Sequence, residues 1–413
     1  MRTKRTCGLL LKMKQMQIMG FLCILMLLLV YMTTIYYHYH QEEVEPKFGP
    51  LHFAEDSRVA HMVLPRGIVE ASSDLEPRAL TAEHISKSKV SVEGSRNLLA
   101  MAVGIEQKGN VDEIIRMFIS ENFTIVLFHY DDNVDAWWDL GWSKDAIHIV
   151  AHSQTKWWFA KRFLHPDVVS IYDYIFLWDE DLGVQNFRPA RYLEIVKVEG
   201  LEISQPALDP NSPGIHHRIT VRNRRNRVHR RVYQDKGRTK CSEESEGPPC
   251  SGFVEGMAPV FSRRAWRCVW YLIQVIINLY RNEKIPFRLL QKDIVFEIFI
   301  QCVVWQNDLV LGWGMDMKFG YCAQGDRTNN VGVVDSEYLV HLSTQSLGSG
   351  SSPKKILRAL SPSQKVPKGR VANPRVQLRR ESTYELQVFM ERWEEAVKED
   401  KQWVDPYKQT LLV

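Results

Sequence analysis

Residues 18–37 form an uncharged, mostly apolar run (IMGFLCILMLLLVYMTTIYY) that constrains the topology of the whole chain. As a helix it would span roughly 30 Å, the thickness of a bilayer core. Five Lys and Arg residues and no acidic residue precede it, whereas glutamates follow at positions 42, 43 and 45. Because positive charge stays in the cytosol, the run predicts a single-pass type II anchor. A cleaved signal peptide and a buried soluble helix are the alternatives.

The charge and cysteine content of the remaining chain describe its compartment. Outside the N-terminal tail, 48 basic residues face 49 acidic ones, so we expect no nucleic acid partner. Five cysteines follow the apolar run, and with this topology they face an oxidising lumen. Asn122-Phe123-Thr124 is a glycosylation sequon, with Asn122 as the acceptor.

The composition divides the chain into segments. Residues 38–96 are polar and weakly patterned, as in a stem, and residues 346–380 are rich in Ser, Pro, Lys and Arg, as in a flexible linker. Ser382-x-x-Glu385 is a capping-box pattern that opens a C-terminal amphipathic helix. The predicted organisation is a cytosolic tail, anchor, stem, lumenal domain, linker and C-terminal helix with tail, over residues 1–17, 18–37, 38–96, 97–345, 346–380 and 381–413.

Short apolar runs alternate with helical patterns in the first half of the lumenal domain. Runs that predict strands cover residues 98–103, 124–130, 147–151 and 172–178, with helices expected over residues 111–120 and 157–164. This alternation predicts a Rossmann-like α/β fold with a mixed, mainly parallel sheet and helices on both faces. Ligands of such sheets bind beyond the carboxyl ends of the strands.

Three consecutive acids, Asp179-Glu180-Asp181, follow the last of these strands. Clustered carboxylates repel one another, and a hard divalent cation would offset that repulsion. Mg²⁺ and Mn²⁺ favour carboxylate oxygens together with phosphate oxygens of a substrate. Convergence of Asp179 and Asp181 on one ion requires the turn that Leu182-Gly183 permits. A solvated acidic loop is the alternative.

Two further features could contribute chemistry. In Gly312-Trp313-Gly314-Met315-Asp316, the glycines permit close approach of a ligand, Trp313 offers a stacking face, and Asp316 could be a general base. His341 follows an apolar run and could be a neutral nitrogen ligand to the same metal. A tight turn with a core Trp and a structural His are the alternatives.

The basic segment 216–240 contains ten Lys and Arg residues and three histidines. It could grip a diphosphate or an anionic acceptor through arginine forks, or be a solvated loop. Cys241 and Cys250 bracket a short loop directly after it, and a disulfide between them suits an oxidising compartment.

Several motifs together resemble a plant family of unknown function that carries the label "lysine ketoglutarate reductase trans-splicing related". They are FLWDEDLG (176–183), HHRIT (216–220), GPPCSGFVEGMAPVFS (to residue 262), NDLVLGWGMDMKFGYC (307–322) and VGVVDSEYLVHL (331–342). The arrangement also looks like a GT-A type glycosyltransferase. That likeness implies a Golgi type II enzyme that moves a sugar from a nucleotide sugar to an unknown acceptor.

The GT-A likeness also implies roles for particular residues. Asp179 and Asp181 would hold Mn²⁺ or Mg²⁺ against the donor diphosphate, and His341 would complete the metal site. Asp316 would act on the acceptor hydroxyl, with Glu255 as an alternative carboxylate. Trp313 and Gly314 would contact the acceptor. A non-catalytic lumenal scaffold or sugar-binding protein with the same fold is the competing hypothesis, and an RNA-associated factor is a third.

One segment departs from the family pattern. Residues 275–306 separate Trp-Tyr-Leu-Ile-Gln from Asn-Asp-Leu, which are adjacent in the family. The segment begins with Val and ends with Gln, whose codons fit the boundaries of an intron in frame. We therefore expect an inserted segment, with the hypothesis that it is an unspliced intron. Its removal would also remove Cys302 and leave four lumenal cysteines, an even number.

Overall fold

The computed structural model describes residues 63–69, 96–234, 240–273, 311–343 and 374–407, together with Leu28 and Met32. Apart from these two residues, the expected anchor 18–37 lies outside the described ranges, as does the expected insertion 275–306. Within the described ranges no helix combines the length and apolar character needed to cross a bilayer. The chain divides into two units, and every described range belongs to the unit of residues 55–78 and 89–413.

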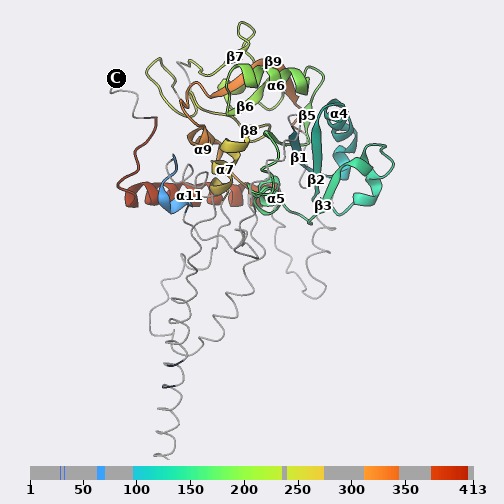
Figure 1. Ribbon diagram of the computed structural model, residues 1–413, viewed down its shortest axis with the longest axis horizontal. Coiled ribbons are helices and arrows are strands. Elements are labelled where there is room, and N and C mark those ends of the chain that lie inside the picture. Colours follow the sequence, from blue (N-terminus) through green and yellow to red (C-terminus); the bar gives the residue numbers. More distant parts are fainter. Residues whose placement is uncertain are drawn as a thin grey trace, which may run out of the picture. The chain divides into compact units, whose positions relative to one another are not determined.

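The centre of this unit is a mixed sheet in the order β3-β2-β1-β4-β8-β6-β9-β5, with β7 also paired to β9. Strands β3, β2, β1 and β4 form one parallel block, and β6 and β9 form a second parallel pair. Strand β8 joins the two because it pairs antiparallel with both β4 and β6 (Figure 1). The predicted mixed α/β sheet is confirmed. The strands are β1 (Asn97–Val103), β2 (Phe123–His129), β3 (Ile147–Val150), β4 (Tyr174–Trp178), β5 (Leu182–Gly183), β6 (Ile203–Leu208), β7 (Val228–His229), β8 (Val260–Ser262) and β9 (Val331–His341).

Helices cover both faces because successive residues of the buried strands point to opposite sides. In β1, Leu98 and Ala100 enter one core while Leu99 and Met101 enter the other. The first core includes residues of α3 (Arg66–Val69), α5 (Lys156–Phe163), α7 (Arg263–Leu272) and α11 (Pro374–Glu399). The second includes residues of α4 (Lys108–Phe118) and α6 (Pro189–Val198).

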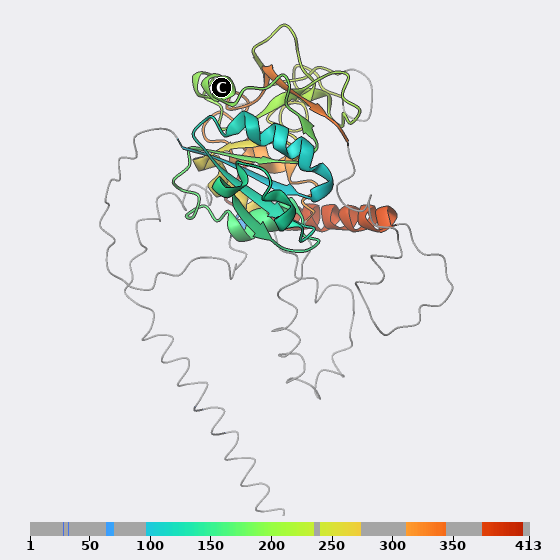
Figure 2. The same cartoon turned by 90° about the vertical axis from the view of Figure 1, so that its right-hand side faces the viewer.

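The C-terminal helix differs from its expected position. It begins at Pro374, inside the segment expected to be a linker, and runs beside α3 (red in Figures 1 and 2). Ser382 therefore lies inside the helix, where its hydroxyl donates to the carbonyl of Leu378 at 2.9 Å. The capping-box interpretation was wrong, because helix-interior serines also bond backwards to the preceding turn.

Part of the expected stem also packs into this unit. Leu64 and Ile68 are buried in the first core. Arg66 donates from its main-chain nitrogen and its guanidinium to Asp400, each at 3.0 Å. This pair joins α3 to the C-terminal end of α11, so two segments far apart in the sequence close the same face of the domain.

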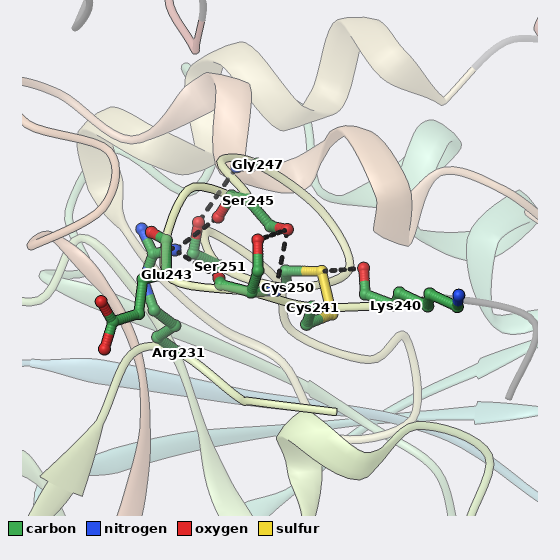
Figure 3. Close-up of a disulfide and its surroundings, with 9 residues drawn as sticks. Arg231, Lys240, Cys241, Glu243, Ser245, Gly247, Cys250 and Ser251 are labelled. Carbon is green, nitrogen blue, oxygen red and sulfur yellow. Dashed lines mark hydrogen bonds between the residues drawn. A yellow bond between two sulfur atoms is a disulfide. The ribbon is translucent and has the colours of Figure 1, made fainter. Parts of the chain in front are cut away.

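Two disulfides stabilise the described part of the chain. Cys241 and Cys250, the expected pair, are bonded (Figure 3), and Cys268 of α7 is bonded to Cys322. The four cysteines after residue 37 other than Cys302 are thus paired. Disulfides persist mainly in proteins of oxidising compartments.

Candidate active site

The acidic triplet follows β4, and its middle side chain points away from the outer two. Glu180 is buried, accepts the main-chain N–H of Gly104 at 2.8 Å and accepts the hydroxyl of Tyr130. Burial raises the pKa of Glu180 to about 8, against the two hydrogen bonds. Asp179 instead faces Lys156, and Asp181 faces His341. Only Asp179 and Asp181 remain available on the other side.

Asp179 faces a buried lysine. Lys156, the first residue of α5, brings its Nζ to 2.6 Å from Asp179 Oδ1 and donates to the carbonyl of Gly256 at 2.6 Å. The Lys156 side chain is 7 % exposed, so its charge needs this partner. This cation was not foreseen, because nothing in the sequence marks one lysine of a short helix as a partner of the triplet.

Asp181 faces His341, and the sheet explains why. Leu182 of β5 pairs with His341 at the end of β9, and the main-chain N–H of Leu342 donates to the carbonyl of Asp181 at 3.0 Å. Asp181 Oδ2 consequently lies 3.4 Å from His341 Nε2. The other ring nitrogen, Nδ1, lies 2.6 Å from the carbonyl of Gly214.

The protonation of His341 follows from these contacts. Burial opposes the imidazolium, but Asp181 and the Gly214 carbonyl outweigh it and raise the pKa of His341 to about 9. The expected neutral form therefore requires a cation that displaces the proton from Nε2. The Nδ1 contact suits such a ligand, since a carbonyl that accepts from one ring nitrogen fixes the tautomer that presents the other.

A second group of carboxylates adjoins this pair through His216. Its ring centroid lies 5.8 Å from that of His341, and its Nδ1 lies 2.7 Å from Glu255 Oε1. Glu255 is buried and also accepts from the hydroxyl of Thr220 at 3.3 Å. The hydrogen bond to Glu255 raises the pKa of His216, with burial opposing it. His216 therefore links the triplet to Glu255.

Asp316 begins the short helix α9 (Asp316–Phe319) and belongs to the same neighbourhood. Burial raises its pKa, while the nearby His217 lowers it and Glu255 raises it further. The structure thus gathers Asp179, Asp181, His341, Glu255 and Asp316 around His216 and His217. With the two histidines included, these seven residues come from five separate stretches of the sequence.

The Gly-Trp-Gly turn before Asp316 is held by α11. Glu385 is buried, accepts the main-chain N–H of Leu311 and that of Gly312 at 2.8 Å each, and also interacts with the N–H of Trp313. Gly314 has φ of 87°, which disfavours other residues, and a Cβ there would meet Leu386 at 2.3 Å. Trp313 is 46 % exposed, as an acceptor-stacking ring would need to be.

The side chains of this group include possible ligands for a divalent cation. Among the described residues no group of three or more His, Cys, Asp and Glu side chains already has the arrangement of a metal site. Asp181 and His341 fit two ligands, given the 3.4 Å separation and the fixed tautomer. Mg²⁺ is commonly held by one or two carboxylates plus substrate phosphates, so this small protein set suits an ion that arrives with a diphosphate.

The remaining expected site residue, Asn122, lies far from this group along the strands. It is exposed directly before β2, and Thr124 is half-buried. A cavity of about 340 Å³ opens beside Asn122 between the amino ends of β1 and β2 and helix α6. Because the acidic triplet follows the carboxyl end of β4, parallel to β1, this cavity is separate from the candidate site. Glycosylation of Asn122 stays a prediction.

The chain has distant likenesses to several solved structures. It is similar to S. aureus TarS 1-349, at 7% identity and a TM-score of 0.27 over 43% of this chain and 54% of that one. It is also similar to the apo-form glycosyltransferase GlyE of Streptococcus pneumoniae TIGR4, at 12% identity and 0.24 over 42% and 35%. A third likeness is to 4-diphosphocytidyl-2C-methyl-D-erythritolsynthase of Anaerococcus prevotii DSM 20548, at 10% and 0.27 over 46% and 81%.

The chain thus spans about half of the TarS chain and about a third of the GlyE chain. TM-scores this low carry no argument about fold or activity. No curated protein matches the sequence.

The family described as "Protein of unknown function (DUF707)" matches residues 56–279 and 298–399. The interruption at 280–297 falls inside the expected insertion 275–306, whose origin stays a prediction. The match includes every residue of the acidic triplet, the Gly-Trp-Gly turn and α11. The chain therefore belongs to the DUF707 family of proteins of unknown function.

Proposed function

We propose that this protein is a metal-dependent glycosyltransferase that moves a sugar from a nucleotide sugar to an acceptor hydroxyl. The observation that carries the proposal is the convergence of Asp181 and His341 beside Asp179, with Glu255 and Asp316 linked to them through His216. Transfer of a sugar from a diphosphate needs positive charge for the leaving group and a base for the acceptor, and these two requirements match the two groups.

Asp181 and His341 would hold Mn²⁺ or Mg²⁺, with Asp179 as a further carboxylate. When bound, such a cation neutralises negative charge on the departing diphosphate. Lys156 keeps Asp179 oriented and adds a second positive charge next to it. The carbonyl of Gly214 keeps the His341 ring in the orientation that presents Nε2.

Asp316 is the proposed base for the acceptor hydroxyl. Burial raises its pKa, which makes the carboxylate a better proton acceptor than a solvated aspartate. Glu255 is the alternative, but both of its oxygens already have partners in His216 and Thr220. The exposed ring of Trp313, three residues before Asp316, offers a stacking surface to the acceptor sugar.

A screen of nucleotide sugars tests this proposal. The purified full chain, in non-ionic detergent, is incubated with each donor with and without Mn²⁺, and release of nucleoside diphosphate is measured. We expect Mn²⁺-dependent hydrolysis of at least one donor, reduced by Asp181→Asn and Asp316→Asn. Asp145→Asn, which alters an exposed aspartate on the loop before β3, is the matched control. Equal hydrolysis in all four proteins would rule the site out.

The Lys156–Asp179 pair favours one other function, a non-catalytic sugar-binding or scaffold protein. Such a protein has no need of a metal, and a buried lysine at 2.6 Å already neutralises one of the two outer acids. Failure of every donor in the screen, together with sugar binding that is independent of Mn²⁺, would favour this alternative.

We further propose that the enzyme is a single-pass type II protein of the Golgi or another endomembrane. Two disulfides and an exposed sequon asparagine support a lumenal domain, and the uncharged run 18–37 supports the anchor. Protease protection of the full chain in sealed microsomes tests it. Digestion of the domain without detergent would contradict this topology.

A further inference from the structure

The described arginines of the basic segment 216–240 differ in how their side chains are engaged. Arg230 pairs with Glu199 at 2.9 Å. Arg231 donates to carbonyls of the loop that the Cys241–Cys250 disulfide closes, including that of Glu243 at 3.0 Å (Figure 3). These two side chains hold the disulfide loop and the end of α6 in place, so they are not available to a ligand.

A set of arginines from the start of α6 and from residues 222–227 lies near α6, the start of β7 and the middle of β9, which are side by side (Figure 1). We call this the arginine surface: Arg188, Arg191, Arg222, Arg224, Arg225 and Arg227. All are exposed except the half-buried Arg222. Arg188, Arg191 and Arg222 surround Glu337 closely enough to act on its charge. Six arginines are therefore grouped on α6 and on the segment that leads into β7.

Few acids balance this charge. Arg191 pairs with Glu337 at 3.2 Å, and Asp335, the other nearby acid, is taken by His229 at 2.8 Å. Among the described residues no carboxylate forms an ion pair with Arg224, Arg225 or Arg227. Their guanidinium groups therefore face solvent with their fork geometry free, which suits recognition of carboxylates.

The arginine surface adjoins the acceptor side of the candidate site. Arg222 lies two residues after Thr220, which donates to Glu255. Its guanidinium lies 3.7 Å from the ring centroid of Tyr338. Tyr338 precedes His341 by three residues on β9, which is roughly 10 Å along the strand. The ends of β1 and β2, with Gly104 and Tyr130, lie on the other side of the triplet, next to Glu180.

We propose that the arginine surface binds an anionic glycan, a chain of uronic acid residues, that extends away from Asp316 and is the acceptor. The role of this glycan as acceptor rests on the proposed function, whereas its binding to the arginine surface does not. A chain of uronic acids presents several carboxylates, and Arg224, Arg225 and Arg227 present three exposed guanidinium groups within four residues. Single-stranded nucleic acid is disfavoured, since residues 222–227 contain no aromatic side chain on which bases could stack.

Binding of oligogalacturonate tests the inference. The full chain in non-ionic detergent is titrated, without donor or Mn²⁺, with a fluorescent oligogalacturonate and with the same oligosaccharide after methyl esterification. We expect binding of the acid form only. The variant Arg224→Gln/Arg225→Gln/Arg227→Gln should bind roughly tenfold more weakly, because exposed charge pairs contribute modestly but three are removed together.

The matched control is Arg379→Gln/Arg380→Gln/Lys401→Gln, which removes three exposed positive charges from α11 and the turn after it. It should bind as the unmodified chain does. Equal binding of the esterified glycan, equal weakening by the control, or tighter binding of a single-stranded RNA of the same charge would overturn the inference. If no donor is hydrolysed but the glycan binds, only the proposed glycosyltransferase activity is refuted. If a donor is hydrolysed but the glycan does not bind, only this inference is refuted.

Discussion

Glu385 on α11 is expected to hold the Gly-Trp-Gly turn in place, although 73 residues separate it from Gly312 in the sequence. Its carboxylate is 8 % exposed and accepts the N–H groups of Leu311 and Gly312 at 2.8 Å each. Hydrogen bonds to charged groups contribute about 1.5–3 kcal/mol each. Glu385→Ala also leaves part-buried N–H groups without their carboxylate partner. We therefore expect the free energy of unfolding to fall by about 3–5 kcal/mol.

Glu385→Gln should cost less, about 1–2 kcal/mol, since one acceptor oxygen remains but the charge is lost. Urea unfolding of the full chain in detergent, followed by tryptophan fluorescence, measures both. The control is Glu394→Ala, an exposed glutamate of the same helix, with an expected change within about 0.5 kcal/mol. Because the turn precedes Asp316, kcat for transfer should fall in Glu385→Ala more than KM rises. The reasoning fails if Glu385→Ala and Glu394→Ala unfold at the same urea concentration.

Three further predictions use the same unfolding assay. Burial lowers the pKa of His129 to about 4, below its value in the unfolded chain. The contribution of His129 to stability is therefore full above pH 6.5 and should fall by about 3 kcal/mol as the pH drops to 4. His129→Leu should flatten this pH dependence, and an unchanged slope would contradict the prediction. Lys156→Met should cost about 1–2 kcal/mol, discounted because the Asp179 side chain is 41 % exposed; no loss would mean the pair contributes nothing. Replacing Cys268 and Cys322 with alanine should cost about 4 kcal/mol, since the bond closes a loop of 54 residues; a loss below 1 kcal/mol would refute the loop-entropy reasoning.

The first half of the sheet could be predicted because its strands are buried on both faces and appear as continuous apolar runs. The runs at residues 98–103 and 124–130 correspond to β1 and β2 within one residue. The second half gave weaker signals. β8 has three residues, and β6 (ISQPAL) contains a proline and two polar residues, so neither has a clear period.

The polar residues of the site divide in the same way. Asp179, Asp181 and His341 could be named because each directly follows or ends an apolar run, where strand ends place ligands. The opposite direction of Glu180 could also have been predicted, since neighbouring side chains on an extended segment alternate. The roles of Lys156 and Glu385 could not be predicted, because both depend on contacts between distant segments that a single sequence does not reveal.

The central claim is that Asp181 and His341 bind a divalent cation together with a diphosphate. The most direct measurement is a titration of the full chain with Mn²⁺, followed by electron paramagnetic resonance, with and without inorganic pyrophosphate. We predict that pyrophosphate strengthens Mn²⁺ binding, and that Asp181→Asn abolishes this effect while Asp145→Asn preserves it. Mn²⁺ binding that is equal in Asp181→Asn and the unmodified chain would contradict the account.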